Sequence, residues 1–248
     1  MAGQDCEKKE VQLPLEFVSL FAHEVRNPLN ALAAVGSILS REPKAEMLPW
    51  LGSTVERQVD RVSFLVDILL DGARLAAGCF KVVEESVSLS KILNEVLEDF
   101  GESLQRAQIT VLREETTNFS DVLAERRRLR SSLIAIVENV VSYVPSGGRV
   151  RFWIIPTESS VELLIQDTGK GMNEEDIEAL ERVSTDRIFE RGARGHLGLS
   201  LILVKAFVES VGGLFSLRGR GDNEWTGIVL KLSFHRFYPA QQGGQGHK

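Results

Sequence analysis

The first third of the chain carries two apolar stripes with the period of an α-helix. Residues 11–40 are predicted to form one long helix, because successive residues placed about 100° apart bring its large apolar side chains onto one side. A break at residues 42–44 precedes a second helix, whose first turn can accommodate Pro49. The stripe of the first helix comprises Phe17, Phe21, Val25, Pro28, Leu32, Val35 and Leu39. The stripe of the second helix, which recurs about every 3.5 residues, comprises Leu48, Leu51, Val55, Val59, Val62, Val66, Leu69 and Ala73.

Two amphipathic helices joined by a short connection are expected to fold back on each other as an antiparallel hairpin. Two helices alone bury little apolar surface, so each stripe needs further partners. We therefore predict that two hairpins pair into a four-helix bundle and that the protein is a homodimer. The alternative is that the hairpin packs on the second half of its own chain.

Beyond Gly78 the pattern changes to short apolar runs, separated by turn residues and alternating with helical segments. Such a succession is typical of a mixed sheet covered on one side by helices, an α/β sandwich. The predicted fold class is therefore multidomain, with an all-α hairpin that forms a dimeric four-helix bundle, followed by an α/β sandwich. We predict helices at residues 89–105, 129–144 and 199–211, and strands at residues 109–112, 119–123, 149–156, 161–167, 214–217 and 227–234. The expected domains are an N-terminal tail (1–10), the hairpin (11–80), the sandwich (81–237) and a disordered tail (238–248).

The amino-acid composition limits the classes of partner that the chain is expected to bind. The chain has 248 residues, with 29 basic against 35 acidic side chains and a net charge of −6, which argues against a nucleic-acid or anionic-membrane surface. The locally basic run at residues 125–130 is interpreted as a solvated helix face. With only Cys6 and Cys79, no disulfide framework is expected. No signal peptide or long apolar run is present, so we expect a cytoplasmic chain without membrane contact. Its input would come from an unknown sensor domain or protein, because none precedes residue 11.

The first helix also carries the chain's most distinctive polar cluster, in the string FAHEVRNPLN at residues 21–30. His23 points nearly opposite to the apolar stripe, and Asn27 lies one turn later on the same outward face. Glu24 flanks the stripe, and Pro28 removes a backbone donor one turn beyond the histidine. For a lone histidine the simplest interpretation is an exposed surface residue on an amphipathic helix.

The packed string H-E-x-R-N-P-L, however, resembles the phospho-acceptor box of bacterial sensor histidine kinases. The resemblance implies that His23 receives a phosphoryl group and that Glu24 orients the imidazole and takes up its proton. It further implies that Asn27 orients the water that dephosphorylates a response regulator.

Four segments of the second half resemble, in order, the ATP-binding domain that histidine kinases share with gyrase, Hsp90 and MutL. The segment IVENVV implies that Asn139 binds the Mg²⁺ bridging the phosphates. The segment DTGKG, directly after a strand, implies that Asp167 accepts a hydrogen bond from the adenine amino group. Gly169 and Gly171 would let the backbone approach the purine and turn without a Cβ clash.

The remaining two segments resemble the lid and the glycine-rich start of the following helix. Phe189 would belong to the mobile lid over ATP, and Gly198 and Leu199 open a helix whose N–H groups can face phosphate. Thr226, before the last strand, matches a threonine that the family places near adenine. Alternatives for these segments are an ordinary Asp/Gly turn and a ligand-free glycine-rich helix start.

Several positions depart from the family pattern. Ala135 replaces an asparagine, Ser142 replaces a lysine that reaches the phosphates, Ser200 replaces a glycine, and the lid between Phe189 and Gly198 is short. These changes predict weakened phosphate recognition within an unchanged fold.

The main hypothesis is a Mg²⁺- and ATP-dependent histidine kinase that phosphorylates His23 and passes the phosphoryl group to an aspartate of a response-regulator receiver domain. Phosphatase activity is a second plausible output. The alternative is a degenerate kinase that serves as a regulator-docking module with little ATP turnover. A gyrase- or chaperone-type ATPase would leave the residues around His23 unexplained.

Overall fold

The structure is a computed structural model that describes residues 15–76, 83–116, 120–181, 196–219 and 224–237. Contacts divide the chain into two compact units, one of residues 1–81 with 173–207 and one of residues 82–172 with 208–248. The predicted domain boundaries at residues 10, 80 and 237 stay predictions. Both predicted tails lie outside the described residues.

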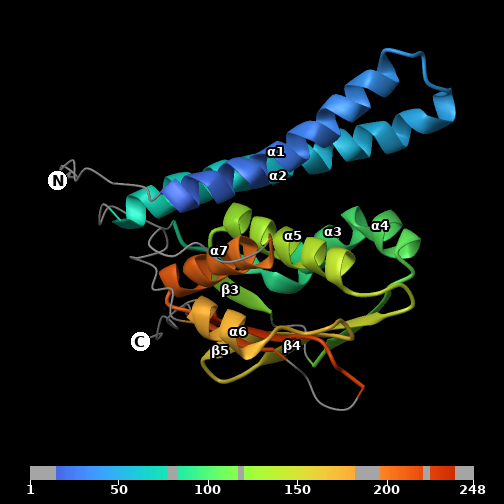
Figure 1. Cartoon of the computed structure of the whole chain (residues 1–248). Helices are drawn as coiled ribbons and strands as arrows, with labels where there is room; N and C mark the ends of the chain where they lie inside the picture. Colours follow the sequence, from blue (N-terminus) through green and yellow to red (C-terminus); the bar gives the residue numbers. More distant parts are fainter. Residues whose placement is uncertain (1–14, 77–82, 117–119, 182–195, 220–223, 238–248) are drawn as a thin grey trace, which may run out of the picture. The chain divides into compact units, whose positions relative to one another are not determined.

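The first unit begins with an antiparallel helical hairpin (Figure 1), as predicted. Helix α1 (Leu15–Leu39) is followed by a 3₁₀ turn η1 (Ala45–Met47) and by α2 (Leu48–Ala76). The connection reverses direction at Glu42, whose φ of 52° lies in the left-handed region. Pro49 occupies the first turn of α2, where its missing N–H leaves no helical bond unmade.

Within one chain the hairpin buries only part of each apolar stripe. Val35 of α1 and Leu51 and Leu65 of α2 are almost fully buried. Other members of the predicted stripes remain open, with Val59 48% and Val66 43% exposed. The large apolar side chains exposed along the two helices are Val18, Leu29, Leu39, Leu48, Val59, Val66 and Leu70. The described hairpin therefore retains an apolar face that its own helices do not cover.

The second unit is built on a five-stranded sheet of order β2-β4-β5-β7-β6. Strand β2 runs parallel to β4, and every other pair is antiparallel, so the predicted mixed sheet is confirmed. A separate two-stranded sheet pairs β1 with β3. The strands are β1 (Glu85–Ser88), β2 (Thr110–Glu115), β3 (Asp121–Ala124), β4 (Arg149–Pro156), β5 (Ser160–Asp167), β6 (Leu214–Arg218) and β7 (Val229–His235).

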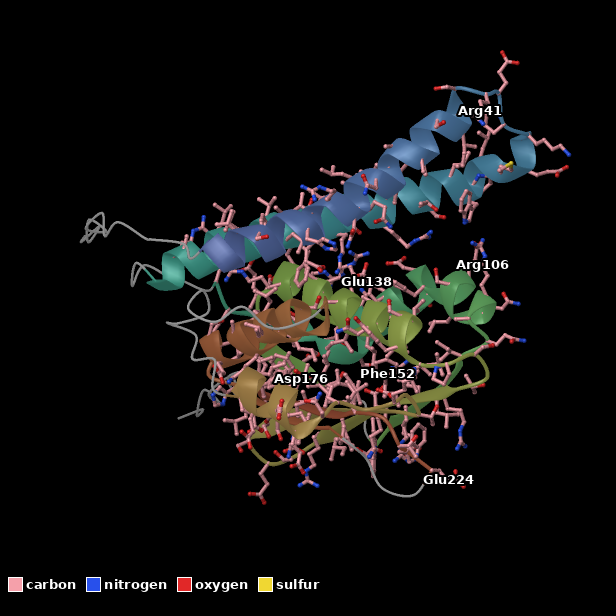
Figure 2. All side chains as sticks on the ribbon, in the orientation of Figure 1. Arg41, Arg106, Glu138, Phe152, Asp176 and Glu224 are labelled. Atoms are coloured by element: carbon pink, nitrogen blue, oxygen red, sulfur yellow. The ribbon has the colours of Figure 1, made fainter. Side chains whose placement is uncertain are left out.

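One face of the five-stranded sheet forms the core of this unit. Burial alternates along β4 and β5, as expected for strands with one face covered. Phe152, labelled in Figure 2, pairs with Ile165, and both are essentially inaccessible. Figure 1 shows α3 (Leu89–Asp99) and α5 (Arg126–Tyr143) together on one side of this sheet. Each fully buried large apolar side chain contributes about 1.5–3 kcal/mol to this packing.

Two arginines of the basic run at the start of α5 form ion pairs with α3. Arg126 forms an ion pair with Glu95 at 2.8 Å, and Arg130 forms one with Asp99 at 2.7 Å, so both link α5 to α3. The exposed Arg126 and Arg127 fit the interpretation of the run as a solvated helix face, whereas Arg128 is buried and does not.

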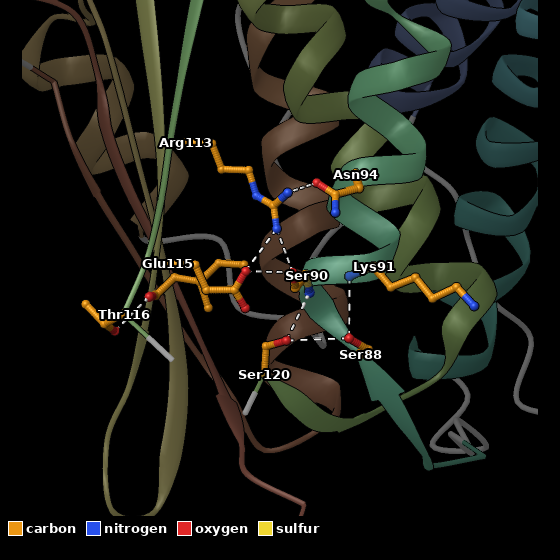
Figure 3. Close-up of polar contacts among 9 residues, drawn as sticks. Ser88, Ser90, Lys91, Asn94, Arg113, Glu115, Thr116 and Ser120 are labelled. Carbon is orange, nitrogen blue, oxygen red and sulfur yellow. Dashed lines mark hydrogen bonds and ion pairs between the residues drawn. The ribbon is translucent and has the colours of Figure 1, made fainter. Parts of the chain in front are cut away.

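Polar contacts also fasten the start of α3 (Figure 3). Ser88 accepts a hydrogen bond from the Lys91 backbone N–H at 3.4 Å, which caps the helix. Ser90 donates to Glu115 at 2.8 Å, and Arg113 donates to Ser90 at 2.6 Å. These contacts tie the end of β2 to the first turn of α3.

Four elements differ clearly from the sequence-based prediction. The helix expected at residues 89–105 is interrupted at Phe100, whose ψ of 1° breaks the helical run before α4 (Gly101–Arg106). Strand β1 was not predicted, because its four residues contain only one buried apolar side chain, Val87. Helix α6 (Glu174–Glu181) was also missed, and α7 (His196–Ser210) begins three residues earlier than predicted.

Among the described residues, no helix is both long and apolar enough to cross a membrane.

Candidate functional site

His23 and Asn27 lie where the helical pattern predicts them. Both side chains are exposed on α1, one turn apart, whereas Pro28 is buried. An exposed imidazole can offer a ring nitrogen to an incoming phosphoryl donor.

Glu24 does not extend into water beside His23 as expected. It is only 3% exposed, and its Oε2 accepts a hydrogen bond at 3.2 Å from Nη2 of Arg61 in α2. The physical reason is that Glu24 lies one turn before Pro28, and the buried line of α1 runs through Glu24, Pro28 and Val35. The last two belong to the predicted apolar stripe, which omitted Glu24 because it is polar.

Arg61 is a residue that the sequence analysis missed. In an antiparallel hairpin, residues at equal chain distances from the turn face each other. Glu24 and Arg61 lie at nearly equal distances from Pro43 in the connection. The sequence therefore places an acidic and a basic residue opposite each other, and this could have predicted the ion pair.

Asp167 occupies the C-terminal end of β5 and is only 6% exposed. Its Oδ1 accepts a hydrogen bond from the backbone N–H of Gly169 at 2.7 Å. Burial raises the pKa of the Asp167 carboxyl above its ordinary value, and backbone hydrogen bonds from Gly169 and Ile228 oppose the increase. A buried acceptor with remaining lone pairs is suited to an amino group such as that of adenine.

Glycines let the backbone pack closely around this carboxylate. A Cβ on Gly227 would lie 1.7 Å from Asp167 Oδ1, and one on Gly169 would lie 2.7 Å from the same atom. Gly171 has a φ of 73°, and a Cβ there would come within 2.2 Å of the Gly219 carbonyl oxygen. Gly227 was not among the predicted site residues, and its signal was its position directly after Thr226.

Pairing of β5 with β7 brings the distant Thr226 to the same place. The Thr226 hydroxyl donates to the Gly169 carbonyl oxygen at 3.4 Å, across 57 residues of sequence. The Asp167 backbone N–H donates to the Ile228 carbonyl at 3.3 Å, and the Gly227 N–H donates to the Asp167 carbonyl at 2.9 Å. Asp167, Gly169 and Thr226 therefore lie close together, and their role in nucleotide binding stays a prediction.

Asn139 lies on α5, next to Glu138, which Figure 2 labels. Its Nδ2 atom is buried and has no hydrogen-bond partner in the described structure. The last turn of α5 reaches the glycine loop, since a Cβ on Gly169 would lie 3.2 Å from the Tyr143 carbonyl oxygen. A buried amide without a partner, one turn before the end of the helix that reaches this loop, fits a polar ligand such as the phosphates of a Mg²⁺-bound nucleotide.

The other predicted nucleotide contacts are only partly placed. Gly198 and Leu199 lie in the first turn of α7, as a helix-opening role requires. Phe189 lies outside the described residues. Among described side chains, no group of three or more His, Cys, Asp and Glu is arranged to hold a metal ion.

Two family models match the chain in succession. Residues 15–78 match the His Kinase A (phospho-acceptor) domain. Residues 124–243 match the histidine kinase-, DNA gyrase B- and HSP90-like ATPase. The first match includes His23, Glu24 and Asn27, and the second includes Asn139 and Asp167.

Curated relatives include the cell-division control histidine kinase PdhS of Brucella abortus (strain S19), which is 26% identical over 238 residues. The alignment covers 88% of this chain but 22% of PdhS, so the chain spans about a fifth of the relative's length.

Solved structures share the fold at low sequence identity. The histidine kinase AdeS of Acinetobacter baumannii is 20% identical, with a TM-score of 0.57 over 86% of this chain and 98% of its own. The full-length kinase ShkA in complex with AMPPNP is 22% identical, with a TM-score of 0.58 over 92% of this chain and 47% of its own. ThkA in complex with the response regulator TrrA is 19% identical, with a TM-score of 0.55 over 90% and 62%. A phospho-acceptor hairpin followed by this ATPase fold places the chain in the family of ATP-dependent sensor histidine kinases.

Proposed function

We propose that this chain is a kinase core that phosphorylates His23 from Mg-ATP and passes the phosphoryl group to an aspartate of a response regulator. The observation that carries the proposal is the buried Asp167 carboxylate, closely surrounded by glycines. The same chain exposes His23 on α1, the helix that matches the phospho-acceptor domain.

Nucleotide recognition follows from the residues around Asp167. The carboxylate accepts a hydrogen bond from the adenine amino group, while Gly169, Gly171 and Gly227 leave room for the flat purine. Thr226, bonded to the Gly169 carbonyl, borders the same space. Asn139 would hold Mg²⁺, which when bound neutralises charge on the phosphates.

The chemistry at His23 is an in-line displacement. A ring nitrogen of the neutral imidazole forms a bond to the γ-phosphorus as the bond to the ADP oxygen breaks. The proton on the other ring nitrogen must leave, and the carboxylate of Glu24 is the nearest acceptor in sequence. Asn27, exposed one turn further along, would orient water for hydrolysis of the regulator's phosphoaspartate.

We further propose that the chain acts as a homodimer, paired through the apolar hairpin face that one chain leaves exposed. The complex of ThkA with TrrA supports a receiver domain as the second partner. A location in the cytoplasm, where such regulators would be met, belongs to the same proposal.

The second candidate function is a degenerate docking module with little ATP turnover. Ser142 in place of a phosphate-reaching lysine favours it, since this side chain is exposed and carries no charge. Ala135, which is fully buried, likewise offers no polar group to the metal.

Labelled ATP separates the two candidates. The wild-type dimer with Mg²⁺ should incorporate label, His23→Ala should abolish incorporation, and His235→Ala should not, because His235 is an exposed residue of β7 outside the site. Equal, negligible labelling of all three proteins would favour the docking module.

A further inference from the structure

Arg61 of α2 forms an ion pair across the hairpin with Glu24 of α1, the residue after the phospho-acceptor. Its Nη2 lies 3.2 Å from Glu24 Oε2, and the two side chains are only 18% and 4% exposed. Glu24 directly follows His23 on α1, so the guanidinium fixes the side chain that is next in sequence to the exposed imidazole.

Burial makes this pair interdependent. A carboxylate with so little solvent contact depends on its cation and on hydrogen bonds to offset the loss of hydration. Removal of one partner takes away part of the compensation for a charge inside the hairpin, whereas exposed ion pairs contribute little. Arg57, one turn earlier in α2, provides a contrast, because its Nη2 donates at 2.9 Å to Thr54 of its own helix.

We propose that Arg61 is a positioning residue for phosphoryl transfer to His23, an inference that rests on the proposed kinase function. Arg61 holds the Glu24 carboxylate charged and in place between α1 and α2, as the acceptor for the ring proton. As the N–P bond forms and ADP leaves, the proton of the other ring nitrogen passes to a Glu24 oxygen, and Arg61 keeps its own charge throughout. Arg61 thus acts through Glu24 and contacts neither ATP nor the transferred phosphoryl group.

The test uses the full chain with Arg61→Gln, which keeps hydrogen-bond donors but loses the charge, and Arg61→Lys, which keeps the charge. Initial rates of phosphohistidine formation are measured against ATP concentration. Arg61→Gln should lower kcat about tenfold or more with KM for ATP unchanged, as a part of the ~10²-fold effect of proton transfer. Arg61→Lys should recover most of the rate. The matched control, Arg57→Gln, should behave as wild type.

A double-mutant cycle shows whether Arg61 acts through Glu24. In a Glu24→Gln background, Arg61→Gln should have no further effect on kcat. The inference would be overturned if the losses in kcat from Glu24→Gln and Arg61→Gln multiply in the double variant. It would also be overturned if Arg61→Lys is no faster than Arg61→Gln. The Glu24→Gln/Arg61→Gln chain buries two neutral amides, so it keeps the cycle interpretable if the single variant melts early by circular dichroism. If the wild-type chain forms no phosphohistidine, the proposed function itself is contradicted. If the wild type is active but the two substitutions lower kcat independently of each other, only the role of Arg61 is contradicted.

Discussion

At the scale of single residues, the nucleotide site depends on one buried carboxylate. Asp167 protonates at a higher pH than an ordinary aspartate, because burial raises its pKa. For the nucleotide-free fold, a raised carboxyl pKa contributes stability that is present below the unfolded value and is lost as the pH rises through the folded value. For adenine binding the direction is opposite, because protonation removes the anionic acceptor.

We expect Asp167→Asn to weaken ADP binding about 10–100-fold at neutral pH, because it removes a charge-assisted hydrogen bond. Wild-type affinity should fall as the pH drops through the raised pKa of Asp167, by more than the affinity of the variant falls. Calorimetry at several pH values measures both effects, with exposed Asp121→Asn as the control. An identical pH dependence for wild type and Asp167→Asn would argue against adenine at this carboxylate.

Gly227→Ala tests the close packing of glycines around Asp167. The added Cβ would lie 1.7 Å from Asp167 Oδ1 and 2.6 Å from the Gly169 nitrogen, so the loop must shift. We predict loss of measurable ADP binding and a lowered melting temperature. Gly101→Ala is the control, because a Cβ there meets no atom within 4 Å. Normal nucleotide affinity in Gly227→Ala would mean that the nucleotide does not lie against this carboxylate.

At the scale of elements, sequence periodicity predicted the helices and strands that bury one face. The strands β4 and β5 and helix α5 were found because alternation and the helical period reflect burial on one face. Periodicity could not find β1, with one buried residue, or the break at Phe100, which apolar side chains on both sides conceal. The pairing of Glu24 with Arg61 was missed because the helix contact is set by three-dimensional register and not by apolar character.

Lys205 links helix α7 to the end of helix α6 through hydrogen bonds that the sequence analysis did not predict. It is 8% exposed, and its Nζ donates to the Leu180 carbonyl at 3.2 Å and to the Glu181 carbonyl at 2.7 Å, at the C-terminal end of α6. A cation at this position satisfies terminal carbonyls and complements the helix dipole.

We predict that Lys205→Met destabilises the fold by about 1.5–3 kcal/mol, because buried charged hydrogen bonds are lost. Differential scanning calorimetry should show a clearly lower melting temperature. Lys231→Met removes a partly exposed ion pair with Glu162 and should change it much less. Equal shifts for the two variants would show that Lys205 does not stabilise the end of α6.

At the scale of the whole molecule, the exposed apolar face of the hairpin is the surface through which we propose that two chains pair. Val59 and Val66 are 48% and 43% exposed although they lie in a stripe of coiled-coil spacing. Burial of this face in a second copy, as we propose, would explain why the apolar pattern continues beyond what one chain covers.

A charge on this face should therefore dissociate the dimer. We predict that Val66→Asp shifts the full chain to monomers in light scattering at micromolar concentration, because the carboxylate would be buried unpaired. Leu214→Asp, at a 72% exposed position on β6, should leave the mass unchanged. A monomeric wild type, or a dimeric Val66→Asp chain, would contradict pairing through the hairpin.

The most direct test of the proposed kinase activity is mass spectrometry of the chain after incubation with Mg-ATP, with samples kept at neutral pH to preserve phosphohistidine. The predicted result is one phosphoryl group on the peptide that contains His23, strongly reduced in Asp167→Asn. A wild-type dimer that binds nucleotide yet carries no phosphoryl group on His23 would contradict the kinase activity and favour a docking module.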